Sequence, residues 1–329
     1  LGRDLMPDLQ RLHLAVGRLR LGAQLRHGGF FGRELIGRQT GGRERAADGH
    51  QDAAEPDPAH IGFVIQPQGP VALDADRLAE RFGTAITVAR NSANLGCAGG
   101  YNTGIDHALS HLAPDYILAI NNDVVADSRM VAEMGTAAGQ DPHVGIVGAR
   151  IYYYDWHGRK DVVWSAGGTI HQWGLKIHRQ RGDGMVDGPE FDYPRDLGWA
   201  SGAAVLLTPA ALSDAGYFNT WYFIGHEDVE LCLKASAAGH RIVYAPQAKA
   251  WHKVGASARK VGISYADPAA YYYLIRHTFP AHVYLYHLAL FPLLIARWGI
   301  LFLVRSRDRA QLRRFITDMK RFFSHSGAA

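Results

Sequence analysis

Two uninterrupted apolar runs, at residues 116–120 and 144–149, constrain the fold of this chain more than any other feature of its sequence. A continuous apolar run of this length is typical of a strand that is buried on both faces of a sheet. Around these runs, apolar residues at helical spacing predict helices over 73–82, 94–112 and 128–138, and alternation predicts a strand over 85–89. Helices that alternate with buried strands predict an open α/β sheet.

The pattern resumes in the second half of the chain after an interruption. Residues 151–196 are aromatic and glycine-rich, with short β-like pieces, and we interpret them as an insertion of hairpins and loops. Such insertions often line a binding site. Strand character returns at 203–208, and a helix with proline in its first turn is expected over Pro209–Ala215.

The composition excludes several classes of protein. The 329 residues carry a formal net charge of +4, and no RNP, zinc-finger or homeodomain pattern is present, which argues against a nucleic-acid partner. Cys97 and Cys232 are too few for a disulfide framework or a zinc site, and we interpret both as small buried thiols. The first residues also lack the pattern of a signal peptide, so we expect a cytoplasmic protein.

The two ends of the chain differ from its centre. Residues 1–70 are biased toward Arg, Gly and His. Apart from a helix expected over 7–25, we interpret them as a poorly ordered or misread segment. Residues 283–304 are nearly long enough to cross a bilayer but include a histidine, a proline and an arginine, and a cationic stretch follows. We expect an in-plane or partly inserted membrane anchor, with a true span or a soluble helical pair as alternatives.

Oxygen-rich side chains follow the first apolar run. Asn121, Asn122 and Asp123 lie where the strand over 116–120 should end. Ligands of open α/β sheets bind beyond the carboxyl ends of strands, and amide and carboxylate oxygens suit a hard divalent cation. The triplet is equally typical of a plain turn, because Asn and Asp favour turns.

A tandem of acids, Glu227 and Asp228, begins an amphipathic helix that Gly239 ends. The positive end of a helix stabilises ionised acids, and a carboxylate kept charged beside a pocket can take a proton from a sugar hydroxyl. The same acids are also typical of an ordinary first helical turn. Position 230 is Glu230 rather than the second histidine of H-E-x-x-H, which excludes a zincin.

Two more segments supply groups for a ligand. The strand expected over 242–245 leads to His252 and Lys253, and this lysine would lie near any diphosphate. The glycine-rich residues 94–104 precede a helix, where backbone amides can approach a ligand closely. They match neither the dinucleotide fingerprint nor the P-loop.

Four of these segments together carry a family resemblance. They are NLGCAGGYNTGI (94–105), YILAINNDV (116–124), GWASGAAVLLTPAAL (198–212) and FIGHEDVELCLKASAAGHRIVYAPQAKAWH (223–252). In this order, over about 160 residues, they resemble family 2 glycosyltransferases with the GT-A fold, especially the rhamnosyltransferase-like bacterial branch. The resemblance implies a GT-A-like open mixed sheet flanked by helices, and an inverting transfer from a nucleoside-diphosphate sugar.

The resemblance also implies roles for individual residues. Asp123 and His252 would bind a divalent cation, Mn²⁺ or Mg²⁺, Asp228 would be the general base, and its neighbour Glu227 would orient the acceptor. The donor-binding residues would be Asn94, Gly96, Asn102, Asn121, Asn122 and Lys253, and the acceptor-side residues Trp199 and Gly202.

The chain departs from the family in two respects. Its metal triplet begins with two asparagines where many members carry acids, so the ion should bind weakly without the donor phosphates. The first nucleotide-binding strands of the family are not recognisable before residue 85, although His60–Ile65 fits one strand. We therefore divide the chain into an atypical segment (1–70), a GT-A-like catalytic domain (71–265) and a helical, basic and apolar, membrane-associated tail (266–329). Tyrosines 271–273 are expected to pack between the last two.

The resulting functional hypothesis is an inverting glycosyltransferase at the inner face of the plasma membrane. It would move a sugar, with rhamnose suggested by the family branch, to a glycan or lipid-linked acceptor. One alternative is an inactive remnant that binds a membrane or a partner, which the unrecognised nucleoside site favours. Another is a metallohydrolase of phosphoesters, for which the ligand set is sparse.

Overall fold

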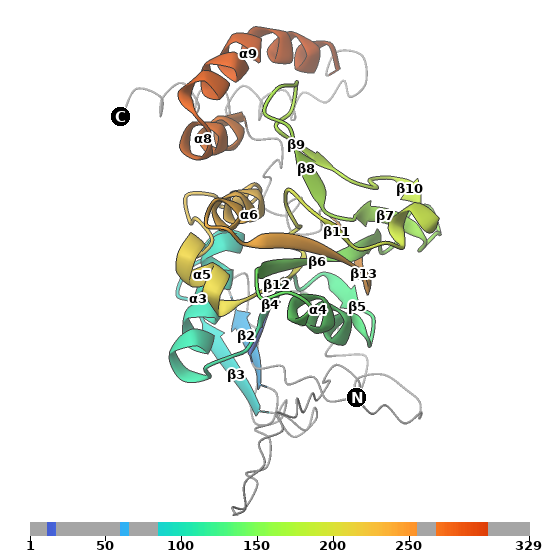
Figure 1. Ribbon diagram of the computed structural model, residues 1–329, viewed down its shortest axis with the longest axis vertical. Helices are drawn as coiled ribbons and strands as arrows, with labels where there is room; N and C mark the ends of the chain where they lie inside the picture. Colours follow the sequence, from blue (N-terminus) through green and yellow to red (C-terminus); the bar gives the residue numbers. More distant parts are fainter. Residues whose placement is uncertain (1–11, 18–59, 66–84, 255–267, 302–329) are drawn as a thin grey trace, which may run out of the picture.

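The computed structural model describes residues 12–17, 60–65, 85–254 and 268–301, with side chains placed within 87–254 and 270–293. They form one large mixed sheet with helices on both faces, a hairpin that rises from it, and two helices beyond that hairpin (Figure 1). The open mixed sheet flanked by helices that the sequence predicts is therefore confirmed.

The strands are β1 (Leu12–Gly17), β2 (His60–Ile65), β3 (Ala85–Arg90), β4 (Ile117–Ile120), β5 (Val124–Ala126), β6 (Val144–Tyr153), β7 (Val162–Ser165), β8 (Gly168–Ile170), β9 (His178–Gln180), β10 (Met185–Val186), β11 (Arg195–Asp196), β12 (Ala204–Leu207) and β13 (Arg241–His252). The helices are α3 (Gly96–His111), α4 (Met130–Gly139), the 3₁₀ turn η1 (Pro189–Phe191), α5 (Pro209–Ala215), α6 (Glu227–Ala237), α8 (Pro268–Thr278) and α9 (Ala281–Leu301).

The centre of the sheet places several strand ends at one edge. β12 lies between β4 and β6 and is antiparallel to both, and β6 pairs in parallel with β13. The carboxyl ends of β4, β6 and β13 therefore point the same way, and β12 begins where they end. The turn after β4, the segment before β12 and the end of β13 all lie at this edge.

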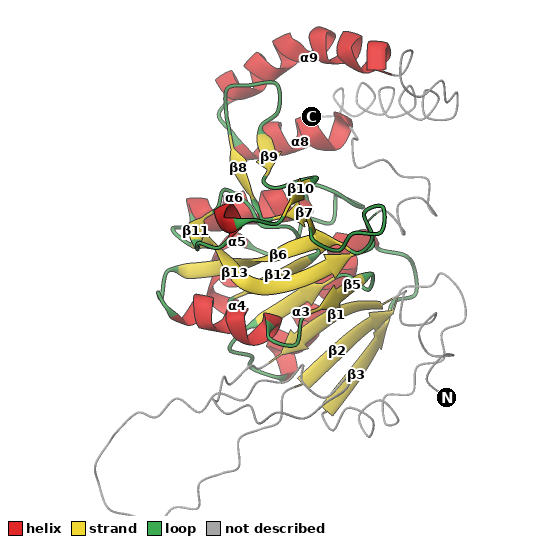
Figure 2. Ribbon diagram, turned by 90° about the vertical axis from the view of Figure 1, so that its right-hand side faces the viewer, coloured by secondary structure: helices red, strands yellow, loops and turns green. Residues whose placement is uncertain are grey.

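The central strands are buried on both faces, as their apolar runs predict. On β4, Ile117 and Ala119 pack into the cluster that includes α3, α5 and α6, whereas Leu118 and Ile120 pack into the cluster that includes α4. Figure 2 shows the sheet enclosed between these helices. Each buried apolar side chain contributes about 1.5–3 kcal/mol, so the two helical layers fix the position of the strand ends.

One prediction for the first part of the chain is wrong. Instead of a helix over 7–25, residues Leu12–Gly17 form β1, which pairs antiparallel with both β2 and β4. The segment LHLAVG alternates apolar residues with period two, and strand edges on both sides outweigh its helix propensity. The strands expected at His60–Ile65 and 85–89 are confirmed as β2 and β3. The helix expected over 73–82 lies outside the described residues.

The insertion expected after β6 is present as β7 to β11 with connecting loops, and a buried arginine anchors it. Arg150, 1% exposed, donates to Asp187 at 2.7 Å, to Asp192 at 2.8 Å and to Tyr244 Oη at 3.0 Å. It also donates to Phe191 O at 2.7 Å. Since buried donors are costly when unpaired, this network holds the insertion against the sheet.

The aromatic residues 271–273 lie where the sequence predicts, between the sheet domain and the last helix. Tyr272 Oη donates to His287 O over 2.9 Å, which joins α8 to α9. On the other side, Tyr271 Oη accepts a hydrogen bond of 2.9 Å from Ile177 N. Among the helices within the described ranges, none has both the length and the apolar character needed to cross a bilayer.

Candidate active site

Backbone hydrogen bonds fix the turn after β4. Asn121 N donates to Ala203 O over 2.9 Å, which ties this turn to the segment before β12. β5 pairs antiparallel with the end of β13, so the residue after Asp123 lies opposite His252. Lys253 N donates to Asp123 O over 3.0 Å. The residues at 121–123 and 252–253 therefore meet at one point.

Asp123 and His252, the two residues expected to hold a cation, contact each other. Asp123 Oδ1 lies 3.0 Å from His252 Nε2, and both residues are buried, with exposed fractions of 7% and 4%. His252 Nδ1 is buried and has no hydrogen-bond partner among the residues that the structure describes. Within the described ranges, no group of three or more His, Cys, Asp and Glu residues could hold an ion. The pair suits a divalent cation only if the substrate supplies further oxygen ligands.

Asp228 lies in the first turn of α6 and is oriented by two backbone amides. Gly202 N donates to its Oδ2 over 2.9 Å, and Val229 N donates to its Oδ1 over 2.8 Å. A methyl group added at Gly202 would lie 3.3 Å from Asp228 Cβ, so only glycine permits this approach without displacement. His226, the residue before the helix, has φ 74°, a left-handed conformation that is uncommon outside glycine.

Glu227 and Asp228 form a pair of acids with different surroundings. Glu227 is 6% exposed, and no group in the described part of the chain forms a hydrogen bond with its Oε2. Burial, followed by the charge of Asp228, raises the pKa of Glu227. Burial also raises the pKa of Asp228, and the N–H groups of Gly202 and Val229 oppose that shift. Backbone N–H groups of residues 225 and 227 likewise oppose the shift of Glu227, but burial outweighs them and raises its pKa to about 8, so the neutral form of Glu227 is favoured.

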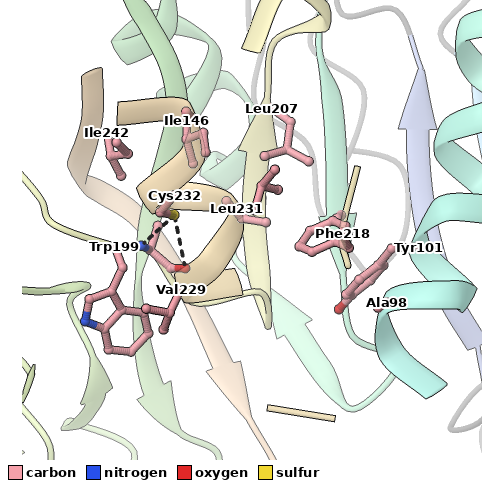
Figure 3. Packing of buried hydrophobic residues seen from close by; sticks show 14 of the residues in the cluster. Ala98, Tyr101, Ile146, Trp199, Leu207, Phe218, Val229, Leu231, Cys232 and Ile242 are labelled. Carbon is pink, nitrogen blue, oxygen red and sulfur yellow. Dashed lines mark hydrogen bonds between the residues drawn. The ribbon is translucent and has the colours of Figure 1, made fainter. Parts of the chain in front are cut away.

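Tyr101, on α3, joins the two halves of the site. Its buried hydroxyl contacts Asn121 Oδ1 and also Gly202 O, the latter at 2.8 Å. Gly202 is the residue that holds Asp228, so one hydroxyl links the turn after β4 to the acid on α6. Figure 3 shows the Tyr101 ring against Phe218, with ring centroids 5.1 Å apart.

The pKa shifts of two residues on α3 reflect how close the acids of the site lie to that helix. Burial raises the pKa of the Cys97 thiol, and the charges of Glu227, Asp228 and Asp123 raise it further. The same three carboxylates contribute to the raised pKa of Tyr101, after burial and Cys97. All three acids therefore act on one turn of α3. Sequence reasoning missed Cys97 and Tyr101 as site residues, although both lie in the glycine-rich motif at the i, i+4 spacing that shares a helix face.

The glycine-rich start of α3 packs against the loop that leads to α6. Cys97 N donates to Phe223 O over 2.9 Å, and Asn94 Oδ1 accepts from Gly96 N over 3.1 Å. A methyl group at Gly96 would lie 2.2 Å from Phe223 O, and its φ of 72° also favours glycine. Asn102 donates to Phe218 O at 2.7 Å and accepts from Phe218 N at 3.1 Å.

These contacts give Asn94, Gly96 and Asn102 a positioning role in the loop before α6. Their predicted contacts with a donor stay predictions. Lys253 Nζ lies 5.0 Å from the centre of the Tyr154 ring. Asn122 is half-buried in the turn after β4. For these two residues, donor contact likewise stays a prediction.

Trp199, predicted on the acceptor side, is part of an aromatic and histidine cluster beside α6. It is 5% exposed, and its indole Nε1 finds no hydrogen-bond acceptor within the described ranges. His178 from β9 lies edge-on to Trp199, with ring centroids 5.7 Å apart, and edge-on to His226 at 5.1 Å. The backbone N–H of the residue after Trp199 donates a hydrogen bond to the sulfur of Cys232 (Figure 3). Cys232 is buried, as the sequence predicts.

The fold and the site together define an α/β protein whose polar groups gather at one edge of a mixed sheet. A sequence profile described as "Glycosyltransferase like family 2" matches residues 66–272, which is more than half of the chain. The chain belongs to this family. The family resemblance and the GT-A-like fold class expected from the sequence are thereby confirmed.

Similar proteins with curated descriptions include several linked by name to glycans. Over 165 residues, 49% of this chain, it is 27% identical to "O-antigen biosynthesis protein RfbC" of Myxococcus xanthus, covering 12% of that protein. Over 58 residues, 18% of this chain, it is 38% identical to "N-acetylglucosaminyl-diphospho-decaprenol L-rhamnosyltransferase" of Mycobacterium tuberculosis, covering 19% of it. A Sinorhizobium fredii protein, "Uncharacterized protein y4gI", is 32% identical over 46% of this chain and 16% of its own length. The matches thus span less than a fifth of each of these relatives.

Among solved structures, the mannosyltransferase PcManGT from Pyrobaculum calidifontis, in complex with GDP-Man and Mn²⁺, aligns with 75% of this chain and 72% of its own. The identity is 16% and the TM-score 0.38. GalNAc-T7 with UDP, GalNAc and Mn²⁺ aligns with 54% of this chain and 33% of its own, at 13% identity and a TM-score of 0.43.

Proposed function

We propose that this protein is an inverting glycosyltransferase that moves a sugar from a nucleoside-diphosphate donor to a hydroxyl of a glycan or lipid-linked acceptor. One observation carries the proposal: the Tyr101 hydroxyl contacts both the turn that leads to Asp123 and the glycine that holds Asp228. Asp123, on the side proposed for the diphosphate, and Asp228, the proposed proton acceptor, thus share one edge of the sheet. Family membership supports the same reaction class.

The proposed reaction needs one base and one leaving group. Asp228 takes the proton of the acceptor hydroxyl, whose oxygen forms a bond to the anomeric carbon. The bond from that carbon to the diphosphate oxygen breaks on the opposite face, and its electron pair leaves with the nucleoside diphosphate. Glu227, held neutral by its buried surroundings, donates a hydrogen bond that orients the acceptor.

Asp123 and His252 are the residues that would hold a divalent cation, with donor phosphate oxygens completing its coordination. His252 Nε2 and the carboxylate oxygen 3.0 Å from it are donor atoms that fit such an ion. When bound, the ion would supply positive charge that stabilises the departing diphosphate. Lys253 would add a second positive charge on the same side.

The acceptor class is proposed from the names of the relatives, which include O-antigen and decaprenol-linked glycan biosynthesis. Rhamnose is the sugar that one of these names suggests. A lipid-linked acceptor would lie in a membrane, and we propose the inner face of the plasma membrane as the location of this protein. Trp199 and Gly202 would lie on the acceptor side, and Asn94, Gly96, Asn102, Asn121 and Asn122 on the donor side.

A screen of nucleotide sugars tests the proposal. UDP-, dTDP- and GDP-sugars are incubated with the protein and Mn²⁺, and release of the nucleoside diphosphate is measured, together with heats of binding for UDP, dTDP and GDP. We expect one nucleotide to bind and its sugar form to turn over. An inactive remnant, the alternative reading, would give neither heat nor turnover, and a metallohydrolase would act on phosphoesters without any sugar acceptor.

Replacing Glu227 by Gln is expected to change the pH dependence of stability and of turnover. A carboxyl whose pKa is raised in the folded protein stabilises it below the pKa of the unfolded chain, and that contribution is lost as the pH rises through the raised value. Wild type should therefore lose melting temperature relative to E227Q as the pH increases. E227Q should also lose the alkaline limb of the turnover profile. If the melting temperatures of wild type and E227Q change with pH in the same way, the neutral state of Glu227 is contradicted.

Replacing Tyr101 by Phe is expected to lower kcat about tenfold with little change in donor affinity, since the hydroxyl contacts the carbonyl of Gly202, whose amide holds Asp228. Tyr152→Phe is the matched control, because Tyr152 Oη also donates a buried hydrogen bond, to Asp187 at 2.7 Å, outside the site. Equal melting temperatures with unequal kcat support positioning. Equal kcat in the two variants would show that the Tyr101 hydroxyl is only structural.

A further inference from the structure

The outer side of α9 and the tip of the β8–β9 hairpin expose large apolar side chains. Trp173 and Leu175, in the loop between β8 and β9, are 58% and 46% exposed. On α9, Leu285, Leu288 and Leu293 are 60%, 37% and 63% exposed. We call these five residues the hairpin–α9 surface.

The two parts of this surface are joined by direct contacts. The Trp173 ring stacks on His282 of α9, with centroids 5.7 Å apart, and meets Tyr286 edge-on at 5.2 Å. Next to it, Gln172 O lies 3.1 Å from Nε2 of the buried His287. Figures 1 and 2 both show the hairpin rising from the sheet to reach α9. The loop and the helix therefore present one continuous surface.

α9 is apolar on the side that faces the protein and on the side that faces away. Val283, His287 and Phe291 are buried, and they alternate at helical spacing with the exposed leucines. A helix that is apolar all round normally has both sides covered. On the outer side the leucines are exposed, so none of the described residues covers them.

The charges around the surface indicate which covering fits. The sequence has no Asp or Glu between Asp161 and Asp183, the stretch that contains the hairpin. It has none between Asp267 and Asp308, the stretch that contains α8 and α9. The same two stretches carry exposed cations, Lys176 in the loop between β8 and β9 and Arg276 on α8. Positive charge around exposed leucines and a tryptophan suits an anionic lipid surface, where indole rings favour the interface.

We propose that the hairpin–α9 surface docks on an anionic lipid bilayer, with α9 lying in the plane of the interface. The inference deepens the proposed function, since a surface-bound enzyme would meet a lipid-linked acceptor, but it rests on contacts outside the active site.

Vesicle flotation of the full chain tests this surface without any sugar substrate. Phosphatidylcholine vesicles with and without phosphatidylglycerol are the probes, and wild type should float with the anionic ones. The combined variant Leu285→Gln, Leu288→Gln and Leu293→Gln keeps helix propensity and every cation. It should lose at least about tenfold in vesicle partitioning, because each buried leucine contributes substantially to insertion.

A second variant addresses the hairpin and has a matched control. Trp173→Ser with Leu175→Ser should weaken vesicle binding, whereas Met185→Ser with Val186→Ser, two side chains on β10 that are each 47% exposed, should not. Circular dichroism confirms that the variants fold. Equal flotation of wild type and the α9 variant would overturn the proposal. It would also be overturned if wild type forms a dimer that does not bind vesicles and that the leucine substitutions dissociate. A variant that no longer floats but still transfers sugar would show that the surface binds lipid independently of catalysis. If wild type itself transfers no sugar, the proposed function is contradicted, and the result for this surface stands on flotation alone.

Discussion

Asp228→Asn is expected to lower kcat by about 10²- to 10⁴-fold while leaving the affinity for the donor unchanged. Asparagine has the shape of aspartate and keeps one acceptor for the amides of Gly202 and Val229, but it cannot take a proton from an acceptor hydroxyl. The loss therefore falls on the chemical step. The measurement is single-turnover transfer with the donor that the nucleotide-sugar screen identifies, together with calorimetric binding of its nucleoside diphosphate.

Glu230→Gln is the matched control for Asp228→Asn. Glu230 also lies in the first turn of α6 and is 1% exposed, but it contacts Asn219 and Lys234 rather than the site. The two changes remove the same charge from the same helix end. A similar fall of kcat in both variants would assign the effect to the charge of the helix rather than to a base. Retained turnover by D228N would remove Asp228 from its proposed role.

Elements whose signals are local could be predicted closely from the sequence. The bounds expected for α5 are those observed, because Pro209 fits the first turn and the Thr208 side chain accepts a hydrogen bond from Ala211 N. The apolar run at 116–120 predicted a strand buried on both faces, and β4 is such a strand. In both cases the deciding contacts lie within a few residues or follow from a simple period.

Elements that depend on distant partners could not be predicted in this way. β1 forms because the edges of β2 and β4 lie on either side of it, and nothing in LHLAVG names those partners. The contact between Asp123 and His252 was expected only through the family resemblance, since spacing along the chain does not bring two such distant residues together. The hydroxyl of Tyr101 was missed for the same reason: its partners, Asn121 and Gly202, lie in the turn after β4 and the segment before β12.

Asp123→Asn is expected to abolish the dependence of donor binding on Mn²⁺. Losing even an outer partner of a metal ligand costs about 10- to 100-fold in metal affinity, and losing the charged ligand itself should cost at least as much. Asparagine keeps an oxygen close to His252 Nε2, now 3.0 Å from the carboxylate, so the buried histidine retains a neighbour while the negative charge is removed. The measurement is calorimetric titration of UDP, dTDP and GDP with Mn²⁺ and with EDTA.

The matched control for Asp123→Asn is Asp127→Asn, just beyond β5. Asp127 Oδ1 accepts a hydrogen bond of 2.9 Å from Arg129 N, a local turn contact that asparagine can preserve. Wild type and D127N should bind one nucleotide more tightly with Mn²⁺ than with EDTA, and D123N should bind it weakly in both. Because this chain offers one carboxylate where many family members carry several, the metal response should rest on that single charge. Mn²⁺-dependent binding that survives in D123N would place the cation elsewhere, and equal binding by wild type with Mn²⁺ and with EDTA would show that donor recognition needs no cation.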